Sequence, residues 1–338
     1  MQVHTISPIK PHGSSPRPIP ASPPLSTPSP VFCLPPSPPD SDLVSLSSTD
    51  SDSLSSTLSS SPSSSPFPGI KVYGHRGCVY EECENTLPGY AKAAAFGAAG
   101  VELDVFQLTD GTLVCYHGTG PDTSPGVMSE SHSVDRTITT FSWSELSSLG
   151  SFTSGWEEGV CGDSKLSYAK VPKLKDSLEL CKSLGLGVKV ELKGRDVVPG
   201  VVKMVKELGM GDTVEISSFD HEQLREVNEL APELRTGALF SSPCPEDFAE
   251  RALNVGASEV HLRYDTCSTV RVAEAREKGL KVMAWFRGPL SMREDSRGWS
   301  DAGNEDEDMY RIVMRSGCEA VCVNRPDVAV GVVGEMEE

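Results

Sequence analysis

Residues 268–286 read Ser-Thr-Val-Arg-Val-Ala-Glu-Ala-Arg-Glu-Lys-Gly-Leu-Lys-Val-Met-Ala-Trp-Phe, and they contain the unit from which most of the chain is built. A helical segment at 268–278 ends at Gly279, and a short apolar strand at 281–286 follows it. Glycine is a frequent residue just after the end of a helix. The same order of helix, glycine and strand recurs at Gly185, Gly209, Gly256 and Gly317. This repetition predicts βα units arranged around a parallel sheet.

Short runs rich in β-branched residues predict eight strands, at 70–74, 101–106, 187–192, 213–217, 235–239, 259–262, 281–286 and 320–323. We predict helices between them at 87–97, 172–184, 197–208, 221–230, 245–255, 268–278 and 308–316. Residues 107–170 break the alternation with turns and a hairpin strand expected at 113–117, and we interpret them as a small insertion after the second strand. Eight βα units favour an α/β fold of the TIM (β/α)8 barrel type over an open doubly wound sheet. No GxGxxG or Walker sequence is present, so no nucleotide cofactor is expected.

The first 68 residues differ sharply from the rest in composition, with 21 Ser and 16 Pro. Such a stretch has too few apolar residues to bury a core, so we expect a disordered tail at 1–68 and a barrel domain at 69–338. Residues 1–39 contain no acidic residue, as in organellar transit peptides, but they hold one Lys and one Arg and show no amphipathic order. We therefore expect a cytoplasmic protein, with a chloroplast or another organelle as the alternative.

The net charge of −18 falls almost entirely on the residues after the tail. Nucleic-acid binding depends on Lys and Arg that neutralise phosphates, so we expect no nucleic-acid partner. No apolar run approaches the roughly 20 residues that span a bilayer, so we expect no transmembrane segment. The sequence predicts no protein partner, and a small molecule remains as the expected ligand.

Polar side chains gather where the predicted strands end, which is the edge at which TIM barrels hold their active sites. Glu102 and Asp104 lie two residues apart and therefore share one face of their strand, and the same is true of Glu191 and Lys193. Three carboxylates that meet at one mouth repel each other, and a set of oxygen ligands suits Mg²⁺ or Ca²⁺. We therefore predict one divalent cation held by Glu102, Asp104 and Glu191. A salt-bridge network with Arg76 and Lys193 is the alternative.

Two histidines follow predicted strands in the same part of the barrel. His75 lies in Gly-His-Arg-Gly at the end of the first strand, and His117 ends the hairpin strand. Imidazoles titrate near neutral pH, so a pair beside a metal site suits general acid and base catalysis. His261 also ends a strand, and we interpret it as a structural residue, with a place in the pocket wall as the alternative.

The order of these motifs resembles that of the glycerophosphodiester phosphodiesterase family. The matching segments are Gly74-His75-Arg76-Gly77, Glu84-Asn85-Thr86, Glu102-Leu103-Asp104, Asp110-Gly111 with His117, and Glu191-Leu192-Lys193. The resemblance implies a TIM barrel, one Mg²⁺ or Ca²⁺, and hydrolysis of glycerophosphodiesters to glycerol 3-phosphate and an alcohol. Carried over residue by residue, it implies an acid and base pair, His75 and His117; phosphate-binding residues, Arg76 and Lys193; metal ligands, Glu102, Asp104 and Glu191; and supporting residues of the Glu-Asn-Thr motif, Glu84 and Asn85. We interpret Trp285 as a further supporting residue that stacks on or walls off the glycerol moiety, with a core aromatic as the alternative.

One position departs from the family pattern. Gly118 stands directly after the second histidine, where family members usually have Asp. This departure keeps open a catalytically weak barrel that binds phosphodiesters. A lysophospholipase D that acts on lysophospholipids is a further alternative.

Overall fold

The computed structural model describes residues 69–117, 137–149, 170–286 and 305–338. The tail predicted at 1–68 and Gly118 lie outside these residues.

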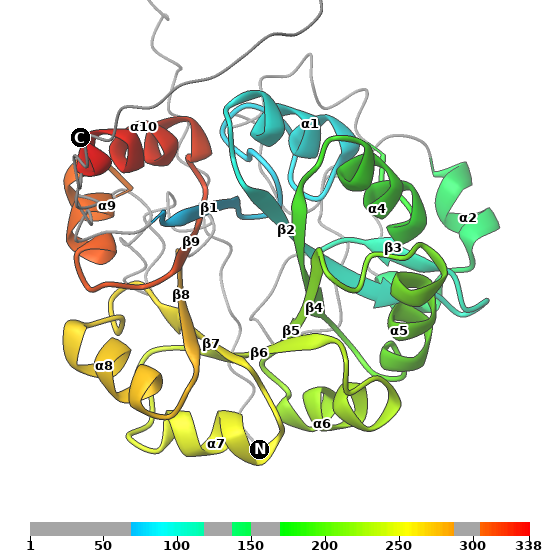
Figure 1. Ribbon diagram of the computed structural model, residues 1–338. Coiled ribbons are helices and arrows are strands. Elements are labelled where there is room, and N and C mark those ends of the chain that lie inside the picture. Colours follow the sequence, from blue (N-terminus) through cyan, green and yellow to red (C-terminus); the bar gives the residue numbers. More distant parts are fainter. Residues whose placement is uncertain (1–68, 118–136, 150–169, 287–304) are drawn as a thin grey trace, which may run out of the picture. The chain divides into compact units, whose positions relative to one another are not determined.

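Eight parallel strands of the described chain close into a barrel, as the repeated βα units predict (Figure 1). The strands are β1 (Lys71–Gly74), β2 (Gly100–Gln107), β4 (Gly187–Leu192), β5 (Val214–Ser218), β6 (Arg235–Phe240), β7 (Glu259–Arg263), β8 (Lys281–Trp285) and β9 (Ala320–Val323). β1 pairs with β9 on one side and with β2 on the other, so the first and last strands complete the ring.

A short antiparallel strand, β3 (Leu113–Cys115), extends β2 at the barrel mouth. Val105 of β2 lies opposite Cys115 of β3, which confirms the predicted hairpin, although the strand ends two residues earlier than expected. His117 follows β3 and is thereby carried back towards the mouth. The described part of the insertion also contains a 3-10 turn, η2 (Ile138–Thr140), and a short helix, α2 (Trp143–Ser148).

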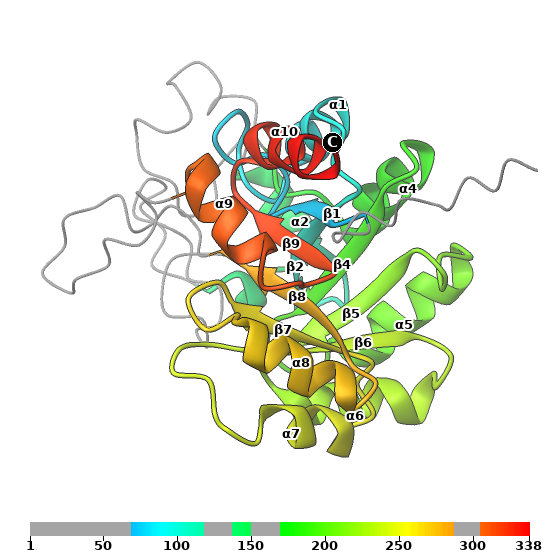
Figure 2. The same cartoon turned by 60° about the vertical axis from the view of Figure 1, so that its left-hand side comes forward.

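Helices surround the barrel on its outer face (Figures 1 and 2). They are α1 (Leu87–Ala95), α4 (Leu174–Ser183), α5 (Val198–Glu207), α6 (His221–Leu230), α7 (Phe248–Asn254), α8 (Thr269–Glu277), α9 (Glu307–Met314) and α10 (Pro326–Glu337). The sequence did not predict α10, which contains two glycines, Gly331 and Gly334, that lower helix propensity. Burial of Ala329 and Val332 in the apolar core compensates for this weakness and completes the eighth βα unit.

The unit at 268–286 shows how the local sequence sets the ends of a helix. The hydroxyl of Ser268 accepts a hydrogen bond from the backbone N–H of Arg271 and caps the start of α8. Gly279 follows the helix with a φ of 78°, a conformation that residues with a side chain rarely adopt. The chain then turns directly into β8, so the glycine explains the sharp change from helix to strand.

Two apolar layers join the strands to the helices. One connects β6–β9 with α7–α10, and the other connects β2, β4 and β5 with α1, α4 and α5. Among the described residues, no helix has both the length and the apolar character that a membrane span requires.

Charged side chains occupy the barrel interior near the amino ends of the strands. The ammonium Nζ of Lys189 lies 2.6 Å from Glu215 Oε1 and 2.7 Å from Glu259 Oε2. His261 Nε2 lies 2.9 Å from the same Glu215 oxygen. These partners support the structural interpretation of His261, and the alternative also holds because His261 lines the cavity described below. Lys189, Glu215, Glu259 and His261 together form a buried ionic cluster.

Candidate active site

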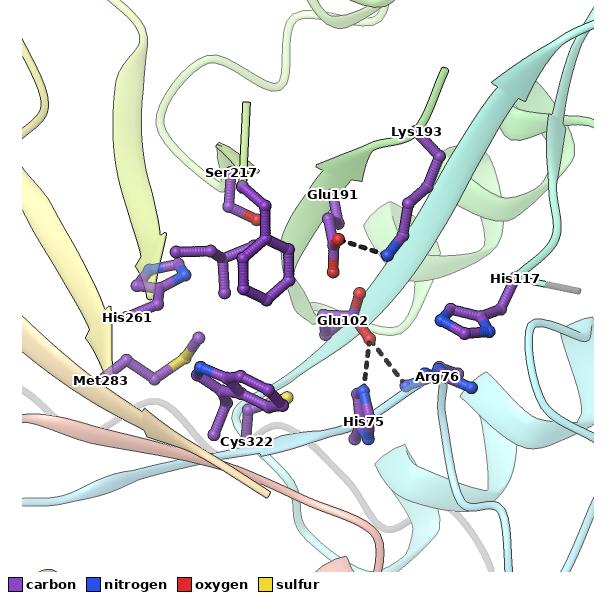
Figure 3. A pocket seen from close by; sticks show the side chains of 13 residues that line it. His75, Arg76, Glu102, His117, Glu191, Lys193, Ser217, His261, Met283 and Cys322 are labelled. Carbon is purple, nitrogen blue, oxygen red and sulfur yellow. Dashed lines mark hydrogen bonds and ion pairs between the residues drawn. The ribbon is translucent and has the colours of Figure 1, made fainter. Parts of the chain in front are cut away.

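A small cavity lies at the carboxyl ends of the barrel strands (Figure 3). Its charged wall comes from β1, β2, β4 and the segment after β3, and consists of His75, Arg76, Glu102, His117, Glu191 and Lys193. Its opposite wall is largely apolar and consists of Ser217, Phe219, Leu239, His261, Met283, Trp285 and Cys322. The position matches the edge at which parallel barrels bind their substrates.

Three carboxylates meet beneath this cavity because of the strand register. Asp104 of β2 lies directly beside Glu191 of β4, and Glu102 lies two residues before Asp104 on the same face. One oxygen from each side chain falls within 4.8 Å of the others. The structure therefore brings together the three predicted metal ligands, Glu102, Asp104 and Glu191.

The electrostatics of these carboxylates favour a bound cation. Burial raises the pKa of Glu102 well above its usual range, and Asp104 and Glu191 raise that pKa further. Burial also raises the pKa of Glu191 to about 7 although Lys193 opposes it. Glu102 Oε1 is buried without a hydrogen-bond partner among the described residues. An unsatisfied oxygen in a set of carboxylates fits the preference of Mg²⁺ or Ca²⁺ for oxygen ligands.

Asp104 differs from its two neighbours because cations surround it. Burial alone would raise its pKa, but Lys193, His117 and Arg76 hold the pKa below its usual range. Lys193 Nζ lies 3.4 Å from Asp104 Oδ1 and also forms an ion pair with Glu191. Asp104 is therefore the carboxylate of the three that stays ionised most readily.

Arg76 links the carboxylates to the loop after β1. Its backbone N–H donates to Glu102 Oε2 at 3.0 Å, and its Nη1 donates to Glu84 Oε2 at 2.8 Å. Its Nε lies 3.4 Å from Asp104 Oδ2. Glu84 thus holds the guanidinium at the cavity wall, which gives this predicted supporting residue a physical role.

Asn85 holds Asp104 at two points. Its Nδ2 donates to Asp104 Oδ2 at 2.8 Å, and its Oδ1 accepts from the backbone N–H of Asp104 at 3.1 Å. Asn85 has a φ of 52°, which asparagine tolerates better than most residues. The predicted supporting residue therefore orients one of the three carboxylates.

Both predicted catalytic histidines line the cavity. His75 lies beside Glu102, with Nε2 at 3.9 Å from Glu102 Oε2, and its Nδ1 lies 2.9 Å from Asn324 Oδ1. Burial and the charge of Arg76 lower the pKa of His75 to about 3, so its ring is neutral. In Figure 3, His117 lies on the other side of Arg76 from His75.

Trp285 lines the apolar wall and is fixed in place. Its indole Nε1 donates to the carbonyl of Phe240 at 3.1 Å, and its ring meets Phe219 edge to face at 5.7 Å between centroids. Phe219 had no predicted role, although it lies two residues after the strand predicted at 213–217. Position at the end of β5 is the signal that identifies it.

The comparisons with known proteins agree with the fold. Residues 75–328 match the model of the glycerophosphoryl diester phosphodiesterase family. A glycerophosphodiester phosphodiesterase from Caldanaerobacter subterraneus subsp. tengcongensis is 27% identical over 273 residues, which cover 78% of this chain and 97% of that protein.

Solved structures show the same barrel. A phosphodiesterase from Oleispira antarctica, in complex with the product sn-glycerol-3-phosphate, is 23% identical with a TM-score of 0.63, over 79% of this chain and 97% of that one. A glycerophosphodiester phosphodiesterase from Agrobacterium tumefaciens is 24% identical with a TM-score of 0.59, and the match covers 78% of this chain and 99% of that one. At these identities the structures establish the fold.

A closed parallel barrel with this polar mouth, together with the matched family model, defines a hydrolase of phosphoric diesters. The chain belongs to the glycerophosphoryl diester phosphodiesterase family.

Proposed function

We propose that residues 69–338 form a metal-dependent catalytic domain that hydrolyses glycerophosphodiesters to glycerol 3-phosphate and an alcohol. Glu102, Asp104 and Glu191 hold one Mg²⁺ or Ca²⁺, and His75 and His117 transfer protons. The observation that carries this proposal is a cluster of three carboxylates beside a cavity that both imidazoles line. Within this cluster, Glu102 Oε1 is buried and has no hydrogen-bond partner among the described residues.

Each side of the cavity has a part in this chemistry. The bound cation supplies positive charge against the phosphodiester oxygens and orients them. Arg76 and Lys193 add fixed positive charge at the same wall, and such preorganised charge is commonly the largest catalytic contribution. Both side chains are already paired with carboxylates, so they approach the phosphoryl group from held positions.

The histidines move the protons. One imidazole accepts a proton from the attacking hydroxyl or water, and the other protonates the departing alcohol. Each such step commonly contributes about 10²- to 10⁴-fold to the rate. The apolar wall around Trp285 and Phe219 leaves the alcohol side with few charged groups, so we place the carbon skeleton of the substrate there.

The test is release of glycerol 3-phosphate from a panel of glycerophosphodiesters by the full chain. We expect release from glycerophosphocholine with Mg²⁺ or Ca²⁺, loss of release after chelation, and recovery when either ion is restored. Release that persists in chelator would contradict the metal site. Lysophosphatidylcholine, tested as a second substrate, detects lysophospholipase D activity. Binding of glycerophosphocholine without release of glycerol 3-phosphate would favour the catalytically weak barrel that binds phosphodiesters.

A further inference from the structure

His75 and Asn324 lie side by side where the barrel closes. His75 follows β1 and Asn324 follows β9, and the two strands pair with Gly74 opposite Val323. The backbone N–H of His75 donates to the carbonyl of Val323 at 2.8 Å. This register brings the ring Nδ1 of His75 to 2.9 Å from Asn324 Oδ1. Both side chains are buried, so solvent does not compete for the contact.

Glu305 determines which end of the Asn324 amide faces His75. In its ionised form the carboxylate of Glu305 can only accept hydrogen bonds, and Asn324 supplies two donors. The side-chain Nδ2 donates to Glu305 Oε2 at 2.6 Å, and the backbone N–H donates to Oε1 at 3.0 Å. The hydroxyl of Tyr310 donates to Oε1 at 3.1 Å. With the amide nitrogen committed to Glu305, the amide oxygen of Asn324 is the atom that faces His75.

This orientation selects a tautomer of the histidine ring. An amide oxygen cannot donate, so the proton of the neutral ring must be on Nδ1. The lone pair then lies on Nε2, which points towards Glu102 at the cavity wall (Figure 3). Reversal of the Asn324 amide would place its oxygen against the ionised Glu305 carboxylate, where two acceptors repel each other.

We propose that Glu305 is a positioning residue that acts through Asn324 to hold His75 in the Nδ1–H tautomer, with Nε2 as a proton acceptor in the active site. The catalytic consequence rests on the proposed function, whereas the tautomer can be measured without turnover. Glu305 itself does not line the cavity, so its effect passes through the amide.

The first measurement is the long-range ¹⁵N–¹H spectrum of the full chain, labelled with ¹⁵N-histidine and free of metal. The chain has 7 histidines, and the His75 signals are those missing from a His75→Gln variant. We expect one protonated nitrogen, assigned to Nδ1, and one unprotonated nitrogen, assigned to Nε2. An Nε2–H tautomer or an equal mixture overturns the proposal, whether or not the protein hydrolyses any substrate.

The second measurement exchanges the two side chains that define the contact. Asn324→Asp alone places two buried carboxylates together, and we expect kcat to fall about 100-fold with little change in KM. Glu305→Gln alone weakens the hydrogen bond that orients the Asn324 amide, and we expect kcat to fall about 10-fold. In the Glu305→Gln/Asn324→Asp double variant, the introduced amide donates to the introduced carboxylate, which again accepts from Nδ1 of His75.

We expect the double variant to recover kcat to within about 3-fold of the wild-type value and to keep the Nδ1–H signal. Glu307→Gln, at an exposed position of α9 two residues away, is the matched control and should leave kcat unchanged. If the losses of kcat in the two single variants multiply in the double variant, Glu305 does not have the proposed positioning role. A wild-type chain that shows the tautomer but no hydrolysis would refute the proposed function and leave this arrangement intact.

Discussion

The side chain of Asn85 forms hydrogen bonds with both the carboxylate and the backbone N–H of Asp104. The amide donates to one carboxylate oxygen at 2.8 Å and accepts from the backbone N–H at 3.1 Å. One short side chain thereby fixes both the backbone and the side-chain rotamer of Asp104, one of the three predicted metal ligands. Loss of a residue that orients a metal ligand typically lowers metal affinity or activity by about 10- to 100-fold.

We therefore predict that Asn85→Gly weakens Mg²⁺ or Ca²⁺ binding by about 10- to 100-fold. Glycine tolerates the φ of 52° at this position, so the variant removes the amide without straining the backbone. Calorimetric titration of the metal measures the effect. Unchanged affinity would show that Asp104 is held well enough by Arg76 and Lys193.

His75→Ala and His117→Ala should each lower kcat by about 10²- to 10⁴-fold, because each removes a group that carries a proton in the reaction. Circular dichroism and thermal unfolding should show that both variants keep the fold. Near-normal turnover by both variants would remove the proposed roles of the two imidazoles.

Lys189→Met should destabilise the protein by about 3–5 kcal/mol. The ammonium group lies between Glu215 and Glu259, and its removal leaves these buried carboxylates without their cation. Urea unfolding measures the loss. Lys206→Met is the matched control, because its ion pair with Glu233 is at the surface and should contribute less than about 1 kcal/mol.

Glu305 should make stability depend on pH in a defined window. Burial raises its pKa to about 7, against the opposing effects of Asn324, Tyr310 and Arg325. The charge of Glu305 also raises the pKa values of Tyr80 and Cys322. A folded pKa above the unfolded value means that the folded state binds the proton more tightly, so ionisation of Glu305 costs stability as the pH rises.

The cost is absent below about pH 4.5, the ordinary value for Glu, and complete above about pH 7. Glu305→Gln removes it. The free energy of unfolding of the wild type, minus that of the variant, should therefore fall between these two pH values. Parallel pH curves for the two proteins would contradict the raised pKa of Glu305.

The fold could be predicted because its signals are local. Each βα unit has its own apolar strand and its own helix, and five of the helices end at a glycine, so eight strands can be recognised without knowledge of their partners. Glu102 and Asp104 were predicted to face one way because alternation within a strand is a property of the chain itself. The helix α10 was missed for the same reason, because its local propensity is weak and its burial supplies the stability.

Chain order and side-chain chemistry alone specified the barrel, the acidic mouth and the two imidazoles. Closure of the sheet decided the rest, because the pairing of β1 with β9 joins His75 to Asn324 across 249 positions of sequence. The hydrogen bonds between Glu305 and Asn324 and the ion pairs of Lys189 arise in the same way, between elements that are remote in the chain. Hydrogen bonds and ion pairs act over a few ångströms, so only the folded arrangement determines which of these polar groups meet.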